Sequence, residues 1–467
     1  MNFSRRNFLQ VMGIAGGVVA LREFAGRVPM AHADPGASPG LFLLCYMRGG
    51  WDQLLTLDPR DNTDPRFSEA NARKAGGSGI MPAYDMVTEA ATKTLLASNP
   101  SGVQRAGNLS FGPAVPTTLM DHAADLAILR GVSMDTLTHE VGRRYFTTGK
   151  FPRGLAASGS SITTLVANAG GPTPLLPNLA VSTESYNEGL PSFASPTSVN
   201  STADLQLVLK PLGKALDPKS AEAIEAFQAK SDTCENHELD QSSVVTTFRE
   251  LTKKSHSVAK SNAASLFQFS LTSPPAEVKT LFDALGISTA ADLAGPRGRA
   301  AIAAQALAKG ISQAVSVELA DDLDDHDSWD TDHAPKIRTA MDALGRLITV
   351  LKNTPHKDGG SVWSKTTLLL FSDFARTPLV NTRNGRDHHL ASSALVAGPK
   401  IRGNQVVGAT ADQLMGAQLI NPGTGKVDAS GVKMRPADIH ATLLTSMGIA
   451  LDPIRNQNPT VISALLK

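Results

Sequence analysis

The stretch Val315–His333, VSVELADDLDDHDSWDTDH, decides the fold because a strand pattern meets a dense group of acids there. Val315, Val317 and Leu319 alternate with other residues, and this period of two is typical of a half-buried β-strand. The carboxylates and imidazoles that follow are Asp321, Asp322, Asp324, Asp325, His326, Asp327, Asp330, Asp332 and His333. Acids alone would indicate a solvated loop, but carboxylate and imidazole together are ligands that divalent metals prefer. We therefore predict a metal site at the end of this strand.

Two other apolar runs also lead to an aspartate. Leu41–Met47 runs through two glycines to Asp52, and Thr366–Phe371 runs to Asp373. Continuous apolar runs of this kind are typical of strands that are covered on both faces. Because the carboxyl ends of parallel strands meet at one edge of a sheet, we expect these acids to lie beside Asp324. A turn or a helix cap is the alternative role for Asp52.

Histidines accompany two of these aspartates. His326 and His333 lie in the acidic stretch itself, and His388 and His389 lie beyond Asp373. Three carboxylates and two or more imidazoles are enough for one divalent ion or a pair of them, and the expected chemistry is hydrolysis of an oxyanion ester. A loop that binds Ca²⁺ for stability alone is an alternative, although the glycine and final glutamate of an EF-hand loop are missing.

A further short strand, Leu126–Leu129, leads to a segment with hydroxyl side chains. Thr138 stands there just before a predicted helix over Val141–Thr148. A hydroxyl at such a position is most often a helix N-cap, but it also lies in the field of the helix N-terminus, where an anionic substrate group binds. Arg143 and Arg144 are close along the chain and could hold that anion. Thr138 is therefore a candidate nucleophile as well as a candidate cap.

Helical periodicity fills much of the chain between the strands. The predicted helices are Val244–Phe269, Ala276–Leu285, Arg299–Ile311, Ile337–Leu351 and a last one that begins at Pro436, and the remaining predicted strands are Leu179–Val181 and Ser393–Ala397. Strands that alternate with helices predict an α/β domain. We interpret residues 183–313 as an irregular and helical insertion or cap on that domain.

The N-terminus carries an export pattern. Ser4–Leu9 contains two adjacent arginines, the weakly apolar run Val11–Leu21 follows, and Ala31–Ala33 fits a cleavage site. The apolar run is too short to span a bilayer comfortably. We predict that the twin-arginine translocase exports the folded chain to the periplasm or the extracellular space, that residues 1–33 are removed, and that no permanent membrane span remains. Residues 34–467 then form a single domain.

The charge balance argues against one class of partner. The sequence carries 44 basic and 43 acidic residues, and no basic face with interleaved aromatic residues is visible. Nucleic acid is therefore a poor candidate partner. The two cysteines, Cys45 and Cys234, form no Cys-x-x-Cys zinc pattern.

Four motifs of the chain resemble those of a known family. They are Arg48–Asp52 (RGGWD), Asp324–His326 (DDH), Ser372–Thr377 (SDFART) and Asp387–His388 (DH). In order and spacing they resemble the motifs of the exported bacterial family called domain of unknown function 1501, which is similar to the alkaline phosphatase and sulfatase superfamily. The resemblance covers nearly all of the mature chain. It implies a doubly wound α/β fold with a mostly parallel central sheet, helices on both faces and a metal site at the strand ends.

The resemblance also implies roles for individual residues. The expected ligands are Asp52 and Asp373 for one ion and Asp324, His326 and His388 for another, with His333 and His389 as alternates. Thr138 would stand near the nucleophile position, and Arg376 would face the anionic group. Two departures leave room for a one-metal site. Family members often carry Glu and Gly where this chain has Asp373 and Ala375, and superfamily phosphatases usually have His where Phe374 stands.

The expected function is that of an exported hydrolase that depends on Zn²⁺, Mn²⁺, Mg²⁺ or Ca²⁺ and cleaves a small-molecule or glycan ester. Neither Cys45 nor Cys234 lies in the Cys-x-Pro/Ala-x-Arg context of sulfatases, so a phosphate ester is favoured over a sulfate ester. The alternative is a non-catalytic metal- or glycan-binding protein of the cell envelope on a hydrolase-like fold.

Overall fold

The main feature of the fold is one mostly parallel sheet. The computed structural model describes residues 39–210, 219, 222–223, 226 and 263–467. The eight strands of the sheet are, in spatial order, β12 (Gln405–Val407), β4 (Ala127–Ser133), β11 (Ala391–Ala397), β8 (Thr366–Ser372), β1 (Leu41–Met47), β7 (Ala314–Ala320), β5 (Asn178–Val181) and β6 (Thr197–Val199). Neighbouring strands are parallel except at β11, which is antiparallel to both β4 and β8. The predicted α/β class is confirmed.

The strand β1 lies inside the sheet because its side chains are apolar on both faces. Leu43 and Cys45 pack into one hydrophobic core, and Phe42 and Leu44 pack into a second core on the opposite face. Burial raises the pKa of the Cys45 thiol, so this cysteine behaves as a small apolar side chain. The apolar run predicted to be a central strand is therefore one.

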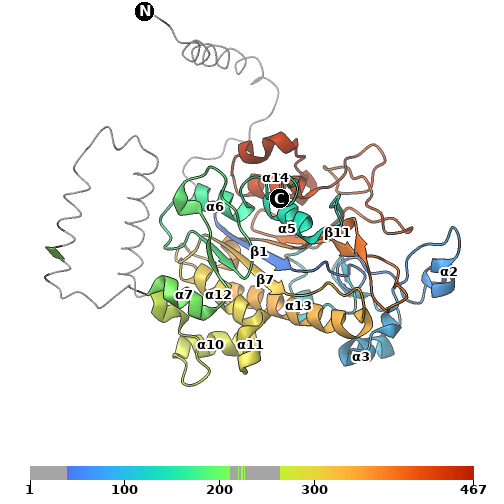
Figure 1. Ribbon diagram of the computed structural model, residues 1–467, viewed down its shortest axis with the longest axis horizontal. Coiled ribbons are helices and arrows are strands. Elements are labelled where there is room, and N and C mark those ends of the chain that lie inside the picture. The colour runs from blue at the N-terminus through green and yellow to red at the C-terminus, as the bar shows by residue number, and fades with distance from the viewer. Residues whose placement is uncertain (1–38, 211–218, 220–221, 224–225, 227–262) are drawn as a thin grey trace, which may run out of the picture. The chain divides into compact units, whose positions relative to one another are not determined.

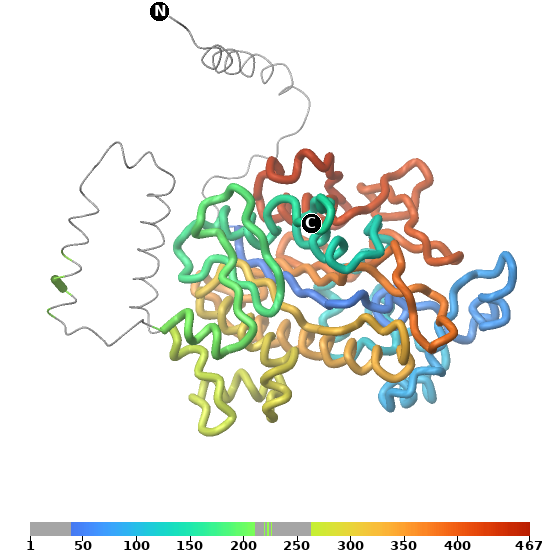
Figure 2. Tube along the Cα trace, viewed as in Figure 1, coloured from blue at the N-terminus to red at the C-terminus, as the bar shows by residue number. Residues whose placement is uncertain are grey.

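Helices cover both faces of the sheet, as the predicted doubly wound arrangement requires. The covering helices are α5 (His139–Thr148), α6 (Ile162–Gly170), α12 (Pro296–Ala308), α13 (Trp329–Asn353) and α14 (Pro436–Ser446). Residues of α12 and α13 join the core that contains Leu43, whereas residues of α5, α6 and α14 join the core that contains Phe42. Figures 1 and 2 show these two groups on opposite sides of β1 and β7.

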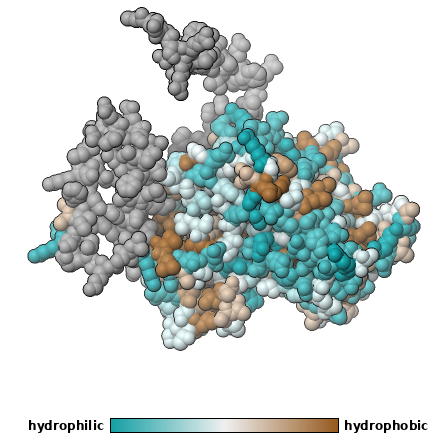
Figure 3. Space-filling model, viewed as in Figure 1, coloured by the Kyte–Doolittle hydropathy of each residue, from teal (hydrophilic) through white to brown (hydrophobic). Residues whose placement is uncertain are grey.

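Smaller elements decorate this framework. The remaining helices are α2 (Glu69–Arg73), α3 (Ala90–Ser98), α4 (Thr117–Met120), α7 (Thr202–Leu209), α10 (Ala276–Leu285) and α11 (Ala290–Ala294), and the remaining strands are β2 (Gln104–Ala106), β3 (Leu109–Phe111), β9 (Ala375–Arg376) and β10 (His388–His389). On the face shown in Figure 3, apolar side chains form several separate patches within a largely hydrophilic surface. Among the described residues, none of the helices is both long and apolar enough to cross a membrane.

The strand β7 differs from its prediction because all of it is buried, including the polar Ser316 and Glu318. Val315, Val317 and Leu319 belong to the core that contains Leu43, whereas Ala314 belongs to the core that contains Phe42 and Glu318 contacts Arg48. The alternation of apolar residues does mark one face of β7, but both faces of the strand are buried. The acidic stretch also differs from a loop, because α13 begins at Trp329. Asp330 and Asp332 occupy its first turn, where the helix dipole favours negative charge.

The block 183–313, predicted to be an insertion or cap, contributes elements to the main framework in its described part. β6 lies within it and extends the main sheet beside β5, and α12 packs against β7. The helix predicted over Val244–Phe269 lies largely outside the described residues, as do the export signal and Cys234. Export and cleavage of the signal therefore stay predictions from sequence.

His440 supplies a test of the packing of α14. Its side chain is fully buried, and burial lowers its pKa from 6.5 to about 4. Nε2 lies 2.7 Å from the carbonyl oxygen of Phe146, so Nε2 carries the proton and Nδ1 has no partner among the described residues. A second proton would place an unpaired charge in the core. Between these two pKa values the unfolded chain binds a proton that the native protein excludes, so the free energy of unfolding falls as the pH falls.

We predict that His440→Gln flattens this pH dependence. The wild type should lose about 2 kcal/mol more than the variant between about pH 7.5 and about pH 5, measured by denaturant unfolding. Above the unfolded-state pKa of histidine the offset between the two proteins should be constant, which serves as the internal control. Parallel stability curves across the whole range would show that His440 titrates normally.

Candidate metal centre

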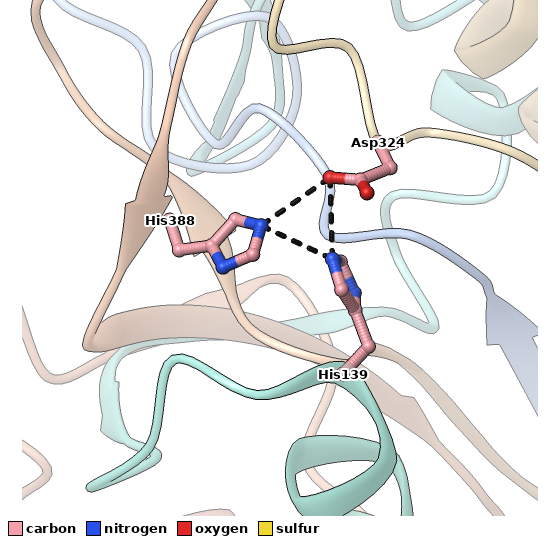
Figure 4. A group of neighbouring side chains, drawn as sticks. All are labelled: His139, Asp324 and His388. Atoms are coloured by element: carbon pink, nitrogen blue, oxygen red, sulfur yellow. Dashed lines mark hydrogen bonds and ion pairs between the residues drawn. The ribbon is translucent and has the colours of Figure 1, made fainter.

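The candidate metal centre lies at the carboxyl ends of the central strands. Asp324 follows β7, His139 begins α5, and His388 belongs to β10; Figure 4 shows the three side chains pointing toward one another. Nε2 of His139 is 3.1 Å from Nε2 of His388 and 3.2 Å from Oδ1 of Asp324. Nε2 of His388 is 3.3 Å from the same carboxylate oxygen. Within the described part of the chain, this is the group of side chains with the spacing of metal ligands.

Each of these imidazoles turns its other nitrogen toward an acceptor. Nδ1 of His388 lies 2.7 Å from the carbonyl oxygen of Leu137, and Nδ1 of His139 lies 2.8 Å from Oδ2 of Asp373. Because carbonyl and carboxylate oxygens only accept, Nδ1 carries the proton and Nε2 keeps its lone pair. Histidines that bind metals are held in the same way. Burial first, and then the charge of Arg376, lower the pKa of His388, which favours the neutral ring.

His326 adds a third imidazole to the edge of this group. Its Nε2 lies 2.9 Å from Nε2 of His388 and 3.0 Å from Oδ1 of Asp324. Its Nδ1 lies 2.8 Å from Oδ1 of Asp387, so it has the same tautomer as the other two rings. His139, Asp324 and His388 have the mutual spacing of metal ligands, and His326 lies beside them in contact with the last two.

Arg376, which was predicted to face the anionic group, contacts a candidate metal ligand in the structure. Its side chain is fully buried, and Nη2 lies 2.5 Å from Oδ1 of Asp324. The other donors of the guanidinium bond to the carbonyl oxygens of Gly49, Gly50 and Arg386. Partial burial would raise the pKa of Asp324, but the hydrogen bond and charge of Arg376 hold it well below its usual range. Arg376 therefore keeps a candidate ligand ionised.

Asp52 stands apart from the group, and the structure gives it the turn role that was its alternative. Oδ1 accepts hydrogen bonds from the backbone N–H groups of Leu54 and Leu55, at 2.7 and 3.2 Å. Oδ2 forms an ion pair with Nε of Arg386 at 2.9 Å, although the two groups lack the alignment of a hydrogen bond. Both side chains are buried, and the Arg386 guanidinium also stacks on Trp329 at 4.3 Å. The Asp52 carboxylate is thus committed to holding the loop after β1.

Asp373 supports the group from behind instead of joining it. Oδ2 accepts from the backbone N–H of Gly49 at 2.9 Å as well as from His139, and Oδ1 accepts from the hydroxyl of Tyr46. The side chain is completely buried. These contacts place Asp373 where it orients His139.

The alternates His333 and His389 have structural partners. His333 is buried in α13, where Nδ1 lies 2.7 Å from Oδ2 of Asp325 and Nε2 accepts from the backbone N–H of Asp52 at 2.9 Å. His389 points its nitrogens at the carbonyl oxygens of Ala391 and Leu414, at 3.0 and 2.9 Å. Neither ring is a member of the ligand group.

Thr138 and Phe374 border the group. Thr138 is the N-cap residue of α5 and is exposed, yet its hydroxyl makes no capping hydrogen bond, and the next residue is His139. The Phe374 ring packs against both His139 and His388, with centroids 4.6 and 4.5 Å away. An aromatic wall therefore lies where superfamily phosphatases usually have a histidine.

The sequence reasoning missed His139 as a possible ligand. A single histidine between Thr138 and Glu140 shows no metal-ligand spacing along the chain, so its signal was weak. Asp387 was read only as part of a motif, although it orients His326. Both residues act through contacts with partners distant in the chain, which periodicity along the sequence does not reveal.

Fold and site together define an α/β protein with a histidine–aspartate cluster at the carboxyl ends of its central strands. The chain belongs to the family described as protein of unknown function (DUF1501), which matches residues 41–456 and confirms the predicted family. No curated protein matches it.

Two solved structures resemble the chain over most of its length at low sequence identity. "Ps i-CgsB in complex with k-i-k-neocarrahexaose" superposes with a TM-score of 0.36 and 11% identity, covering 91% of this chain and 75% of that one. The lipoteichoic acid synthase LtaP from Listeria monocytogenes superposes with a TM-score of 0.35 and 9% identity, covering 93% and 78%. Similarity of this degree transfers no chemistry to the present chain.

We predict that His139, His326 and His388 are all in the Nδ1–H tautomer in metal-free protein near neutral pH, because each Nδ1 faces an oxygen acceptor. Two-bond ¹⁵N–¹H correlation spectra of histidine-labelled protein would measure this, and single His→Gln variants would assign the signals. An Nε2–H pattern for His388 would contradict the arrangement, because the carbonyl oxygen of Leu137 would then have no donor from that ring.

We also predict that Asp52 is required for stability. Asp52→Asn should lower the free energy of unfolding by about 3–5 kcal/mol, because it leaves Arg386 buried without its counter-charge. The exposed Asp85 offers a matched control, and Asp85→Asn should change stability by less than about 0.5 kcal/mol. Equal unfolding midpoints for the two variants would refute the structural role of Asp52.

Proposed function

We propose that this protein is an exported metal-dependent hydrolase of phosphate esters or, less favoured, sulfate esters. The observation that carries the proposal is the convergence of Nε2 of His139, His326 and His388 on Oδ1 of Asp324, with every Nδ1 already bonded to an acceptor. Such a set of lone pairs and negative charge fits a divalent cation, and the mixed imidazole–carboxylate composition suits Zn²⁺ or Mn²⁺ well.

The residues would divide the work among themselves. His139, Asp324 and His388 would hold the ion, with His326 as a further ligand, while Asp373 and Asp387 fix the ring orientations. The bound ion would supply polarisation of an ester oxygen and a lowered pKa of a coordinated water or hydroxyl. The Thr138 hydroxyl, exposed beside His139 and free of a capping bond, is the candidate nucleophile. Its place at the N-terminus of α5 would favour negative charge on the substrate.

The choice of an oxyanion ester as substrate rests on the chemistry of the cluster and on the resemblance of the motifs to the alkaline phosphatase and sulfatase superfamily. Export by the twin-arginine pathway would bring the enzyme to small-molecule or glycan esters outside the cytoplasm.

One observation favours a second candidate, a non-catalytic metal- or glycan-binding protein of the envelope. Phe374 packs on two of the candidate ligand rings and removes the position from which a further histidine could hold a second ion. A single ion without an activated nucleophile would bind without turnover.

Turnover assays separate the two candidates. Purified protein should hydrolyse nitrophenyl phosphate, bis-nitrophenyl phosphate or nitrophenyl sulfate when Zn²⁺, Mn²⁺, Mg²⁺ or Ca²⁺ is added, and chelation should remove the activity. Asp324→Ala should lower the rate by about 100-fold or more, because it removes a ligand with its charge. Metal content by elemental analysis should fall in parallel.

Asp332→Ala is the matched control, since Asp332 is an exposed acid of the same stretch that lies outside the ligand group. It should keep both metal and activity. Metal binding that Asp324→Ala abolishes, together with silence across the ester panel, would support the binding protein and overturn the hydrolase. Failure to bind any of the four metals would overturn the hydrolase and the metal-binding form of the second candidate, and would leave only glycan binding.

A further inference from the structure

A polar cavity shares a wall with the candidate metal centre. It has a volume of about 430 Å³, and its lining includes Tyr46, Arg48, Arg143, Glu184, Arg299 and Glu318. The Tyr46 hydroxyl donates to Asp373, and the same carboxylate accepts from His139. Arg143 lies four residues after His139 in α5, so both side chains lie on one face of that helix. One buried carboxylate thus separates the cavity from the ligand group.

Most charges that line the cavity are paired. Nε of Arg48 donates to Oε2 of Glu318 at 3.1 Å, and Nη2 of Arg143 donates to Oε1 of Glu184 at 2.9 Å. Each lining carboxylate therefore has an arginine of its own. Desolvation raises the pKa of Glu318 to about 6, although the charges of Arg48 and Arg299 oppose the shift.

Arg299 is the lining arginine that has no hydrogen-bonded carboxylate among the described residues. Its Nε and Nη2 atoms are buried and have no hydrogen-bond partner among the described residues. Asp321 approaches Nη2 to only 4.0 Å, and the side chain of Arg299 is 11% exposed whereas that of Asp321 is 57% exposed. Nε and one terminal nitrogen of arginine form the fork that binds two oxygens of a carboxylate, sulfate or phosphate side by side. An unsatisfied buried donor pair beside a cavity is costly unless an acceptor enters.

We propose that this cavity is a subsite for an oxyanion that the substrate carries outside the bond to be cleaved, and that the guanidinium of Arg299, which lines the cavity, binds it. The subsite takes a sulfate, phosphate or carboxylate group, and it excludes uncharged esters of the same size because they leave the guanidinium unpaired. This proposal rests on the proposed function in one respect, which is that the bound anion is treated as part of a substrate. Anion binding itself needs no metal. Substrates with two anionic groups, as on a densely charged glycan, fit the pair of sites.

Calorimetric titration of inorganic sulfate, inorganic phosphate and acetate into chelator-treated full-length protein tests the subsite. The wild type should bind at least one of these anions with one-to-one stoichiometry. Arg299→Met should weaken binding by roughly 10- to 100-fold, which is the value of a charged hydrogen-bonded pair. Arg299→Lys keeps the charge without the fork, so its affinity should lie between the two. Arg105→Met removes a charge from an exposed position and should change nothing.

Further variants locate the anion. His388→Ala should leave binding intact, because His388 belongs to the ligand group and not to the cavity. Loss of binding in His388→Ala, equal affinities of wild type and Arg299→Met, or no binding to the wild type would each overturn the subsite. Anion binding that depends on Arg299, without ester turnover, would contradict the hydrolase and support the subsite. Ester turnover without anion binding would support the hydrolase and contradict the subsite.

Discussion

The site depends on the close approach of several hydrogen-bond acceptors to one another. Nε2 of His388 lies within 3.3 Å of two other imidazole nitrogens and of Oδ1 of Asp324. With Nδ1 of each ring donating to an oxygen, no ring proton remains to place between them. Arg376 offsets part of this excess of negative potential, because Nη2 contacts the carboxylate of Asp324 and Nη1 lies 3.4 Å from Nε2 of His326. A cation among the rings, as proposed, would relieve the mutual repulsion between their lone pairs.

Backbone geometry brings the side chains this close. Gly49 follows β1 with a φ of 106°, and a Cβ atom there would lie 2.5 Å from the backbone nitrogen of Leu323, next to Asp324. Gly142 faces the carbonyl oxygen of Asp373, which a Cβ atom would approach to 2.2 Å, so α5 can pack directly on the end of β8. The loop after β7 and the first turn of α5 therefore reach the same point only because these two positions lack a side chain.

The framework of this site could be predicted from sequence because it depends on local patterns. Leu41–Met47 is apolar without interruption and forms β1 with those bounds, and the helix expected over Ala276–Leu285 is α10 with the same bounds. Parallel pairing of β8, β1 and β7 then brought Asp324 and Asp373 to one edge, as expected. The strand β6 was harder to see, since three residues in a Ser- and Thr-rich segment give no period to detect.

The division of labour among the acids could not be predicted in this way. Asp52, Asp324 and Asp373 have the same side chain and similar positions after apolar strands. Their roles differ because their partners differ. Asp52 forms a buried ion pair with Arg386, and Asp324 pairs with Arg376 but stays partly exposed. Asp373 is buried and accepts hydrogen bonds from Tyr46 and Gly49. Each of these partners is distant in the chain or hidden on another layer. Similar reasoning explains His139, whose importance arises only when β10 carries His388 to within 3.1 Å of it.

Asp373 links the two halves of the site through electrostatics. On one side its carboxylate makes His139 a better electron donor by accepting its Nδ1 proton in a hydrogen bond. On the other side, burial and then the charge of Asp373 raise the pKa of Tyr46 well above its usual value, so the phenol stays protonated. The carboxylate of Asp373 therefore carries one negative charge between the cluster and the cavity. It accepts a hydrogen bond from His139 on the side of the cluster and from Tyr46 on the side of the cavity. A cation bound in the cluster, as proposed, would meet an imidazole polarised by Asp373, while an anion in the cavity would meet the uncharged phenol of Tyr46 instead of the Asp373 carboxylate itself.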